Sequence, residues 1–287
     1  MTSLSEQLKP EMLSRLGDFS IMAREAVLGV MSGLHTSISK GSGGDFIQYR
    51  PWTQGENLRD VDWKLYARQD RLYNKVRRDD TVMRCAIVLD CTASMSYKGK
   101  SAVLSKYQYA AILGVCLASV ASAQNDNVAL IIYSGSGLKR IGFARQDDIL
   151  GLVDAIDRLE PNGNANLDAV LGEIDVFLEQ SRGLTFFISD FIDMDMERLL
   201  RHFLANSREL RLCHILDRDE LELPFSGTLD FRDAENNDGI LVAPDLTRKA
   251  YQAKMENWLG QVRNSALEWR AQYQFSTSDA SFLEYFC

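Results

Sequence analysis

The chain has 287 residues, of which 46% are hydrophobic and 25% are charged, and its formal net charge is −8. These values are typical of a globular protein with a substantial core, and they exclude a disordered or low-complexity chain. The net negative charge argues against a general nucleic-acid-binding protein. The five cysteines are scattered and odd in number, which indicates neither a disulfide framework nor a zinc site and favours a reducing compartment.

The chain shows no sequence signal for export or membrane insertion. Its start, MTSLSEQLKPEML, has acidic and polar residues where a signal peptide needs a basic end and an apolar stretch. The longest apolar stretch, residues 109–123, is too short and too rich in Ser and Ala to span a bilayer. We therefore expect a cytoplasmic protein.

Residues 1–80 are predicted to form a helical and loop-rich extension that packs on the main domain. A helix is expected over 4–31, interrupted near Pro10, followed by a Gly-rich segment with aromatic anchors and a short strand at 72–76. Within this extension we single out four residues, which are Arg50, Arg59, Asp62 and Trp63. We favour a structural role for them, in which paired Arg and Asp side chains fix the extension to the main domain. The second hypothesis is a docking surface for a partner protein.

Residues 81–287 alternate between strands and helices, which is typical of a parallel sheet covered by helices on both faces. Strands are predicted at 85–89, 128–133, 138–142, 184–189, 210–216 and 273–276. Helices are predicted at 100–123, 149–156, 167–178, 194–205, 246–272 and 280–286, with a small hairpin insertion at 227–242. The fold class is therefore α/β, with a doubly wound, mostly parallel, Rossmann-like sheet. The GSG turn at 135–137 makes the 138–142 strand an antiparallel edge strand.

A candidate site follows from the predicted strand order. In the order 3-2-1-4-5-6, the first and fourth strands are neighbours, and ligands bind beyond their carboxyl ends. Asp90 follows the first strand and Asp190 follows the fourth. If the chain stays extended after Asp90, Thr92 and Ser94 point to the same side as Asp90. Such hard oxygen ligands suit Mg²⁺ or Mn²⁺, whereas the alternative is that the two carboxylates cap backbone amides.

These residues also carry a family resemblance. The pattern D-x-T-x-S at Asp90, Thr92 and Ser94, with S-D at Ser189 and Asp190, resembles the metal-ion-dependent adhesion site of von Willebrand factor A domains. Two longer runs, GGDFIQYRPWTQGENLRDVDWKLYARQDRLYNKVRRDD and HILDRDELELPFSGTLDFRDAE, resemble the bacterial family called domain of unknown function 58. The resemblance implies a von Willebrand A-like domain that acts as a non-catalytic adaptor beside a MoxR-type AAA+ ATPase, in a chaperone-like or assembly role.

The chain departs from the adhesion-site pattern in one loop, PNGNANLDAV. Ala165 stands where the resemblance implies a metal-binding Thr, and Asn164 or Asn166 could supply an amide oxygen instead. The competing interpretation is that Asn166 caps the following helix. Two functional alternatives therefore stay open, a metal-dependent hydrolase that uses the same carboxylates and a metal-free scaffold.

The sequence argues against two classes of enzyme, P-loop NTPases and hydrolases that use a histidine with a Ser or Cys nucleophile. The run SMSYKGKS resembles a phosphate-binding loop, but Ser94 replaces its first glycine, so we expect no nucleotide. The three histidines are His35, His202 and His214; His202 is expected on a helix surface and His214 in a strand, and no Ser or Cys nucleophile motif is placed near either of these two. We therefore expect structural histidines and a protein that is not an enzyme.

Overall fold

The protein is described from a computed structural model. The described residues are Pro10, Ala26, 48–51, 65–66, 72–76, 84–124, 126–143, 149–164, 166–179, 183–206, 208–236 and 238–286. The chain divides into two compact units, one of Leu34–Val82 and the other of Met83–Cys287 together with Met1–Gly33. The predicted helix over 4–31 lies almost wholly outside the described residues, and the division at residue 80 stays a prediction.

The larger unit is built on a six-stranded sheet with the order β10-β7-β6-β3-β4-β5. Its strands are β3 (Arg84–Asp90), β4 (Asn127–Ser134), β5 (Gly137–Phe143), β6 (Gly183–Ser189), β7 (Glu209–Leu216) and β10 (Gln272–Thr277). All neighbouring pairs are parallel except β4 and β5, which are antiparallel. Numbered along the chain, this is the order 3-2-1-4-5-6, so the predicted doubly wound sheet and its antiparallel edge strand are confirmed.

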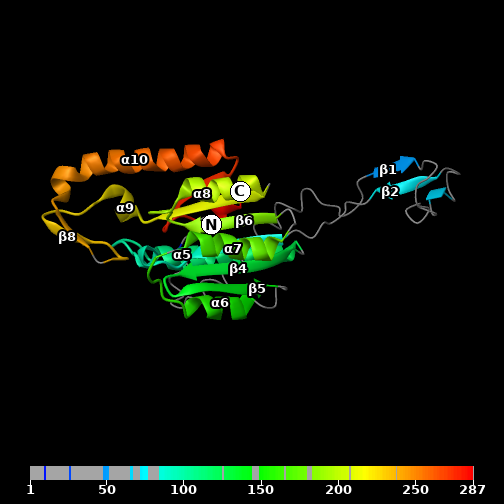
Figure 1. Cartoon of the computed structure of the whole chain (residues 1–287), viewed down its shortest axis with the longest axis horizontal. Helices are drawn as coiled ribbons and strands as arrows, with labels where there is room; N and C mark the ends of the chain where they lie inside the picture. The colour runs from blue at the N-terminus through cyan, green and yellow to red at the C-terminus, as the bar shows by residue number, and fades with distance from the viewer. Residues whose placement is uncertain are drawn as a thin grey trace, which may run out of the picture. The chain divides into compact units, whose positions relative to one another are not determined.

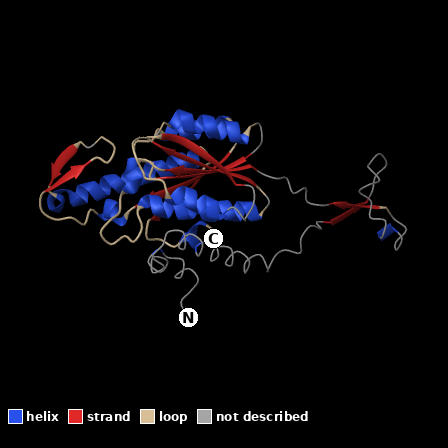
Figure 2. Ribbon diagram, turned by 90° about the horizontal axis from the view of Figure 1, so that it is seen from below, coloured by secondary structure: helices blue, strands red, loops and turns tan. Residues whose placement is uncertain are grey.

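Helices cover both faces of the sheet (Figures 1 and 2). The α-helices of the larger unit with described bounds are α5 (Lys106–Ala123), α6 (Ile149–Asp157), α7 (Leu167–Leu178), α8 (Met196–Ala205), the short α9 (Arg218–Glu222), which lies beyond the end of the sheet (Figure 1), and α10 (Pro244–Glu268). Ala86 and Val88 of β3 pack into a core with α7 and α8. Gly114 of α5 lies over Ile87 on the opposite face, because alternate side chains of a strand point to opposite faces.

The central helix α5 is buried nearly all round, which agrees with its apolar sequence. Its buried residues run from Lys106 to Ala121, as expected for a helix without a polar face. The helix begins at Lys106 and not at residue 100, because Ser105 and Gln108 form a capping box that fixes its first turn. No helix of the described residues is long and apolar enough to cross a membrane.

The C-terminal part differs from the prediction in three places. Helix α10 ends at Glu268, four residues before the expected end, and the chain then enters β10 through Arg270, whose φ is 61°. The predicted closing helix over 280–286 is a single 3-10 turn, Phe282–Tyr285. The short helix α9 was not predicted; Asp217 and Glu220 close a capping box at its start.

Two small hairpins complete the described fold. The predicted insertion at 227–242 is confirmed as β8 (Leu229–Arg232) paired antiparallel with β9 (Gly239–Val242). In the smaller unit, β1 (Gln48–Pro51) pairs antiparallel with β2 (Tyr73–Val76), so the expected strand at 72–76 is present.

Gly135 and Gly163 allow two loops at the carboxyl edge of the sheet to approach closely. A Cβ on Gly135 would lie 2.5 Å from the Gly163 Cα atom. We expect Gly135→Ala to lower the free energy of unfolding by about 1–3 kcal/mol, because backbone must move to relieve the overlap. Urea denaturation measures the change. The control Gly142→Ala, where no heavy atom lies within 4 Å of the added Cβ, should change stability by less than about 0.5 kcal/mol.

Candidate functional site

The site lies where the carboxyl ends of β3 and β6 meet. The two strands are parallel neighbours with Leu89 opposite Ile188, so Asp90 and Asp190 leave the sheet side by side, as the strand order predicts. Both carboxylates are almost fully buried, with 3% and 1% of their surface exposed. Burial of this extent requires that each carboxylate be hydrogen-bonded or paired with a cation.

Hydrogen bonds hold both oxygens of Asp90. Its Oδ1 accepts from the Thr92 amide at 2.9 Å and from the Thr92 hydroxyl at 2.7 Å. Its Oδ2 accepts from the Ser189 hydroxyl at 2.6 Å, and Ser189 in turn accepts from the Phe191 amide at 2.9 Å. Asp90 therefore does bind a backbone amide, as the capping alternative expected, and it is also fixed by two hydroxyls.

Thr92 and Ser94 are brought together by a turn and not by an extended chain. The backbone is extended at Thr92, but Ala93–Ser96 form a 3-10 helix, so the expectation of a continued extended run is wrong beyond Thr92. The turn places the Thr92 and Ser94 hydroxyls 3.2 Å apart. Neighbouring ligands of an octahedral Mg²⁺ lie about 2.9 Å apart, and the two oxygen separations along this chain, 2.7 Å and 3.2 Å, bracket that value. The separations of Thr92 Oγ1 from its two neighbours are thus close to those between adjacent ligands of a hard cation.

The loop that carries the two asparagines lies against this turn. The Ala93 amide donates to the Gly163 carbonyl at 3.0 Å, and the Asn162 amide donates to the Cys91 carbonyl at 3.0 Å. Asn166 caps α7, because its side chain accepts from the Ala169 amide at 3.1 Å. Asn164 instead lines the pocket in front of Asp90, so of the two it is the one placed to face a ligand. Ala165 lies outside the described residues.

Asp190 is held by a buried cation that the sequence analysis did not single out. The Lys106 ammonium, with a fully buried side chain, donates to Asp190 Oδ2 and to Glu220 Oε1, each at 2.7 Å. The other Asp190 oxygen accepts from the Ile192 amide at 3.1 Å. The sequence contained a signal for this buried cation, because Lys106 is the single charged residue between Ser101 and Asn125, a span that is otherwise apolar or uncharged.

The electrostatics of the site follow from burial and from this ion pair. Burial, and then the neighbouring Asp190 carboxylate, raise the pKa of Asp90, while hydrogen bonds from Ser189 and Thr92 act in the opposite direction. Burial disfavours a charged Lys106, but Asp190 and Glu220 outweigh it and raise the pKa of the ammonium above its ordinary value. Lys106 therefore stays charged at neutral pH.

A pocket of about 230 Å³ opens in front of Asp90 and Thr92. Its rim is mostly acidic, with Asp193, Asp195 and, from the turn between β8 and β9, Glu235, and it also includes Arg198, which is ion-paired with Asp168. Burial, then Asp233, Asp193 and the two site carboxylates, raise the pKa of Glu235. No three His, Cys, Asp or Glu side chains among the described residues gather in a group that could hold a metal ion. A cation here would therefore depend on the hydroxyl oxygens.

The run that resembles a phosphate-binding loop makes other contacts. The Gly99 amide donates to Asp217 at 3.0 Å and the Lys100 amide donates to Asp219 at 2.9 Å. A Cβ at Gly99 would lie 2.2 Å from an Asp217 oxygen. The amides of this turn thus bind carboxylates that belong to the chain itself.

Two of the three histidines are described, and both make structural contacts. His214 lies in β7, and four aromatic rings surround it at centroid distances of 5.2 to 5.8 Å, namely Phe191, Trp258, Tyr273 and Phe275. Its Nδ1 lies 2.9 Å from the Tyr273 hydroxyl. His202 contacts Asp175 at 3.0 Å. His35, Arg59, Asp62 and Trp63, and the side chain of Arg50, lie outside what the structure describes.

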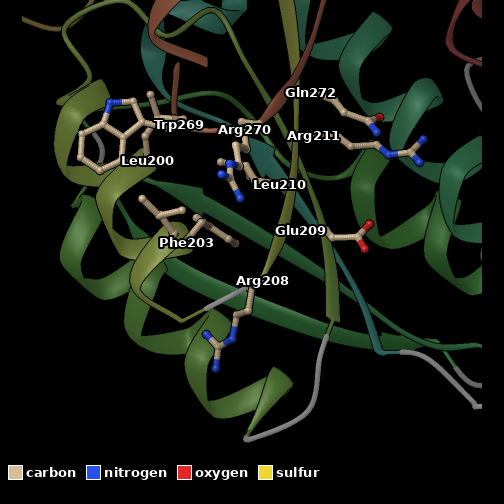
Figure 3. Close-up of a pocket in the computed structure, with 11 residues that line it drawn as sticks. Leu200, Phe203, Arg208, Glu209, Leu210, Arg211, Trp269, Arg270 and Gln272 are labelled. Atoms are coloured by element: carbon tan, nitrogen blue, oxygen red, sulfur yellow. The ribbon is translucent and has the colours of Figure 1, made fainter. Parts of the chain in front are cut away.

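A second pocket, of about 470 Å³, lies at the opposite edge of the sheet (Figure 3). Trp269, Leu200 and Phe203 gather on one side of β7, whereas Arg211 and Gln272 point to the other side. Arg208 at its rim is ion-paired with Asp175 and donates to the Glu179 carbonyl at 2.7 Å. None of the predicted site residues lines this pocket, so the carboxyl edge of the sheet remains the candidate site.

The doubly wound sheet, with a D-x-T-x-S turn after β3 and a second carboxylate after β6, defines a von Willebrand A-like domain. The chain belongs to the family described as protein of unknown function DUF58, whose model matches residues 48–258. A related sequence is the uncharacterized protein Rv1480 of Mycobacterium tuberculosis, 22% identical over 79% of this chain and 72% of that protein.

The solved structures that are similar to the chain include the following two. The conserved hypothetical protein BatB of Bacteroides thetaiotaomicron is 14% identical to this chain. The match covers 68% of this chain and 90% of the BatB chain, with a TM-score of 0.42. The SpRpn10 VWA domain is 15% identical to this chain. The match covers 47% of this chain and 76% of the SpRpn10 chain, with a TM-score of 0.37.

Ser189 links Asp90 to the backbone after β6, and its removal should be costly. In Ser189→Ala, Asp90 loses one donor and the buried Phe191 amide loses its acceptor, so we expect the free energy of unfolding to fall by about 1–3 kcal/mol. Chemical denaturation measures this change. Ser96→Ala is the matched control, since that hydroxyl is exposed and donates to the Ala93 carbonyl; equal losses in the two variants would contradict the assigned role of Ser189.

His214 should make stability depend on pH. Burial lowers its pKa from 6.5 to about 4, so the unfolded chain takes up a proton first as the pH falls. This proton uptake lowers the free energy of unfolding. The loss is absent above pH 6.5, grows as the pH falls from 6.5 to 4, and reaches roughly 3 kcal/mol below pH 4. Urea titrations at several pH values should show a shallower pH dependence for His214→Phe than for the wild type. Parallel curves for the two proteins would contradict this assignment.

Proposed function

We propose that the protein is a non-catalytic adaptor that binds another protein at the carboxyl edge of the sheet, through a divalent cation held by Asp90, Thr92 and Ser94. The observation that carries this proposal is that Thr92 Oγ1 lies 2.7 Å from Asp90 Oδ1 and 3.2 Å from Ser94 Oγ, which is close to the spacing of adjacent ligands in a hard-cation site. The pocket in front of Asp90 and Thr92 leaves room for a group from outside.

Oxygen ligands of this kind suit Mg²⁺ or Mn²⁺ and not zinc. When bound, the cation would offer an open coordination position to a carboxylate of a partner. Two other residues would support the cation: Ser189 holds Asp90 in place through its hydrogen bond, and Asn164 offers an amide oxygen at the pocket wall. The described residues of the pocket include Asp193, Asp195 and Glu235 against the single cationic residue Arg198, which is ion-paired with Asp168, so an acidic partner would be repelled unless the cation were present.

The partner that we propose is a MoxR-type AAA+ ATPase, with the adaptor acting in a chaperone-like or assembly role in the cytoplasm. Membership of the DUF58 family supports this choice, since the sequence resemblance implies such an ATPase beside the domain. In this proposal neither nucleic acid nor nucleotide is a ligand. The four signature residues Arg50, Arg59, Asp62 and Trp63 are proposed to stabilise the N-terminal extension, with partner docking as the second hypothesis.

A metal-free scaffold is the alternative favoured by a specific observation, because Lys106 already neutralises Asp190. That alternative predicts partner binding that is unchanged in the presence of a chelator. A metal-dependent hydrolase would instead turn over a substrate without any partner. Partner pull-down with and without chelator, together with a hydrolysis screen of the isolated protein, separates the three functions.

The metal and partner roles of Asp90 are tested by Asp90→Asn, which removes the charge and keeps the shape. We expect Mn²⁺ affinity, measured by calorimetry, to fall by roughly tenfold or more, since cation affinity follows the charge of the ligands. Pull-down of the ATPase should weaken in parallel. Asp154→Asn, on the exposed surface of α6, is the control and should leave both unchanged. Full partner binding by a folded Asp90→Asn protein would refute the proposal.

A further inference from the structure

Lys106 is a cation built into the candidate site. It begins α5, its side chain is fully buried, and its ammonium contacts Asp190 and Glu220 at 2.7 Å each. Glu220 is fixed in turn, because its second oxygen accepts from the Asp217 amide at 2.7 Å. The three charged groups come from the start of α5, the end of β6 and the first turn of α9, so packing of three separate elements holds them together.

This arrangement has a direct effect on the second carboxylate of the site. Asp190 Oδ2 is bound to the ammonium and Oδ1 to the Ile192 amide, so each oxygen already has a partner within the chain. A carboxylate oxygen can accept more than one contact, but a cation bound to Asp190 would either lie next to the positive charge of the Lys106 ammonium or leave that buried ammonium with one counter-charge fewer, and both are unfavourable. Asp90 has no cationic partner among the described residues. It accepts hydrogen bonds from the Thr92 amide, the Thr92 hydroxyl and the Ser189 hydroxyl.

We infer that Lys106 acts as an internal counter-cation that withholds Asp190 from the metal, so that the site holds its cation through Asp90 alone. This inference rests on the proposed metal site. A site with one carboxylate binds a divalent cation more weakly than a site with two, because affinity follows the number of charged ligands. The cation is then retained well only when a partner supplies a further carboxylate, so cation and partner bind cooperatively.

The test is a double variant that frees Asp190 without changing the net charge of the site. Lys106→Met combined with Glu220→Gln removes one positive and one negative charge, while the Gln side chain keeps an acceptor for the Asp217 amide. We expect this protein to bind Mn²⁺ roughly tenfold or more tightly than the wild type in calorimetry, because Asp190 becomes a ligand. Since the net charge is unchanged, a gain in affinity reports the release of Asp190.

Controls locate the effect and keep the test decisive. Lys98→Met removes a charge from an exposed residue of the same segment and should leave Mn²⁺ affinity unchanged. Adding Asp190→Asn to the double variant should return the affinity to the wild-type level or below. If the double variant does not fold, as judged by circular dichroism, Lys106→Gln combined with Glu220→Gln takes its place, since it also keeps the net charge, and it should bind Mn²⁺ more tightly than the wild type.

The outcomes distinguish this inference from the proposed function. Equal affinity of the wild type and the Lys106 variants, with binding still lost in Asp90→Asn, overturns the role of Lys106 and leaves the metal adaptor intact. Absence of Mn²⁺ binding in every variant overturns both. Tighter binding that persists after Asp190→Asn shows that Asp190 is not the released ligand and also overturns the inference.

Discussion

The parallel pairing of β3 with β6 is the constraint on which the rest of the site depends. It brings two strand ends to one edge and buries two carboxylates next to each other, at 3% and 1% exposure. Two negative charges buried so close together in a protein interior are unstable unless other groups compensate them. The surrounding structure supplies that compensation, with hydroxyls and amides at Asp90 and with an ammonium at Asp190.

The two carboxylates consequently have different roles. Within the described part of the chain, the donors that hold Asp90 are all neutral, and Asp90 lines a pocket that opens between α7, α8 and the turn after β8. Asp190 is part of a buried ion-pair group that joins α5, β6 and α9. A group of this kind is costly to bury, and its value here lies in fixing the first turn of α5 and the β7–α9 turn against the sheet end. The geometry of the site thus comes from the same contacts that close the fold.

Much of the fold could be predicted from the sequence. The apolar runs of β3, β4 and β6, the helical periodicity of α7 and the GSG turn before β5 depend on local patterns, which read directly as elements. The strand order then placed Asp90 and Asp190 together. The boundaries were less predictable: α5 starts at Lys106 because Ser105 caps it, and α10 ends at Glu268 where Arg270 adopts a positive φ. Both ends depend on single residues and not on periodicity.

The sequence by itself determined the class of fold, the pairing of the two carboxylates and the three oxygens of the D-x-T-x-S turn, because these follow from neighbouring residues and from strand order. Only the tertiary structure decided what surrounds them. Lys106 and Glu220 are 114 residues apart, and Glu235 reaches the pocket from a distant hairpin. Such contacts leave no periodic signal, since they depend on how whole elements pack. For that reason the packing of α5 and α9 sets the charge that a ligand would meet.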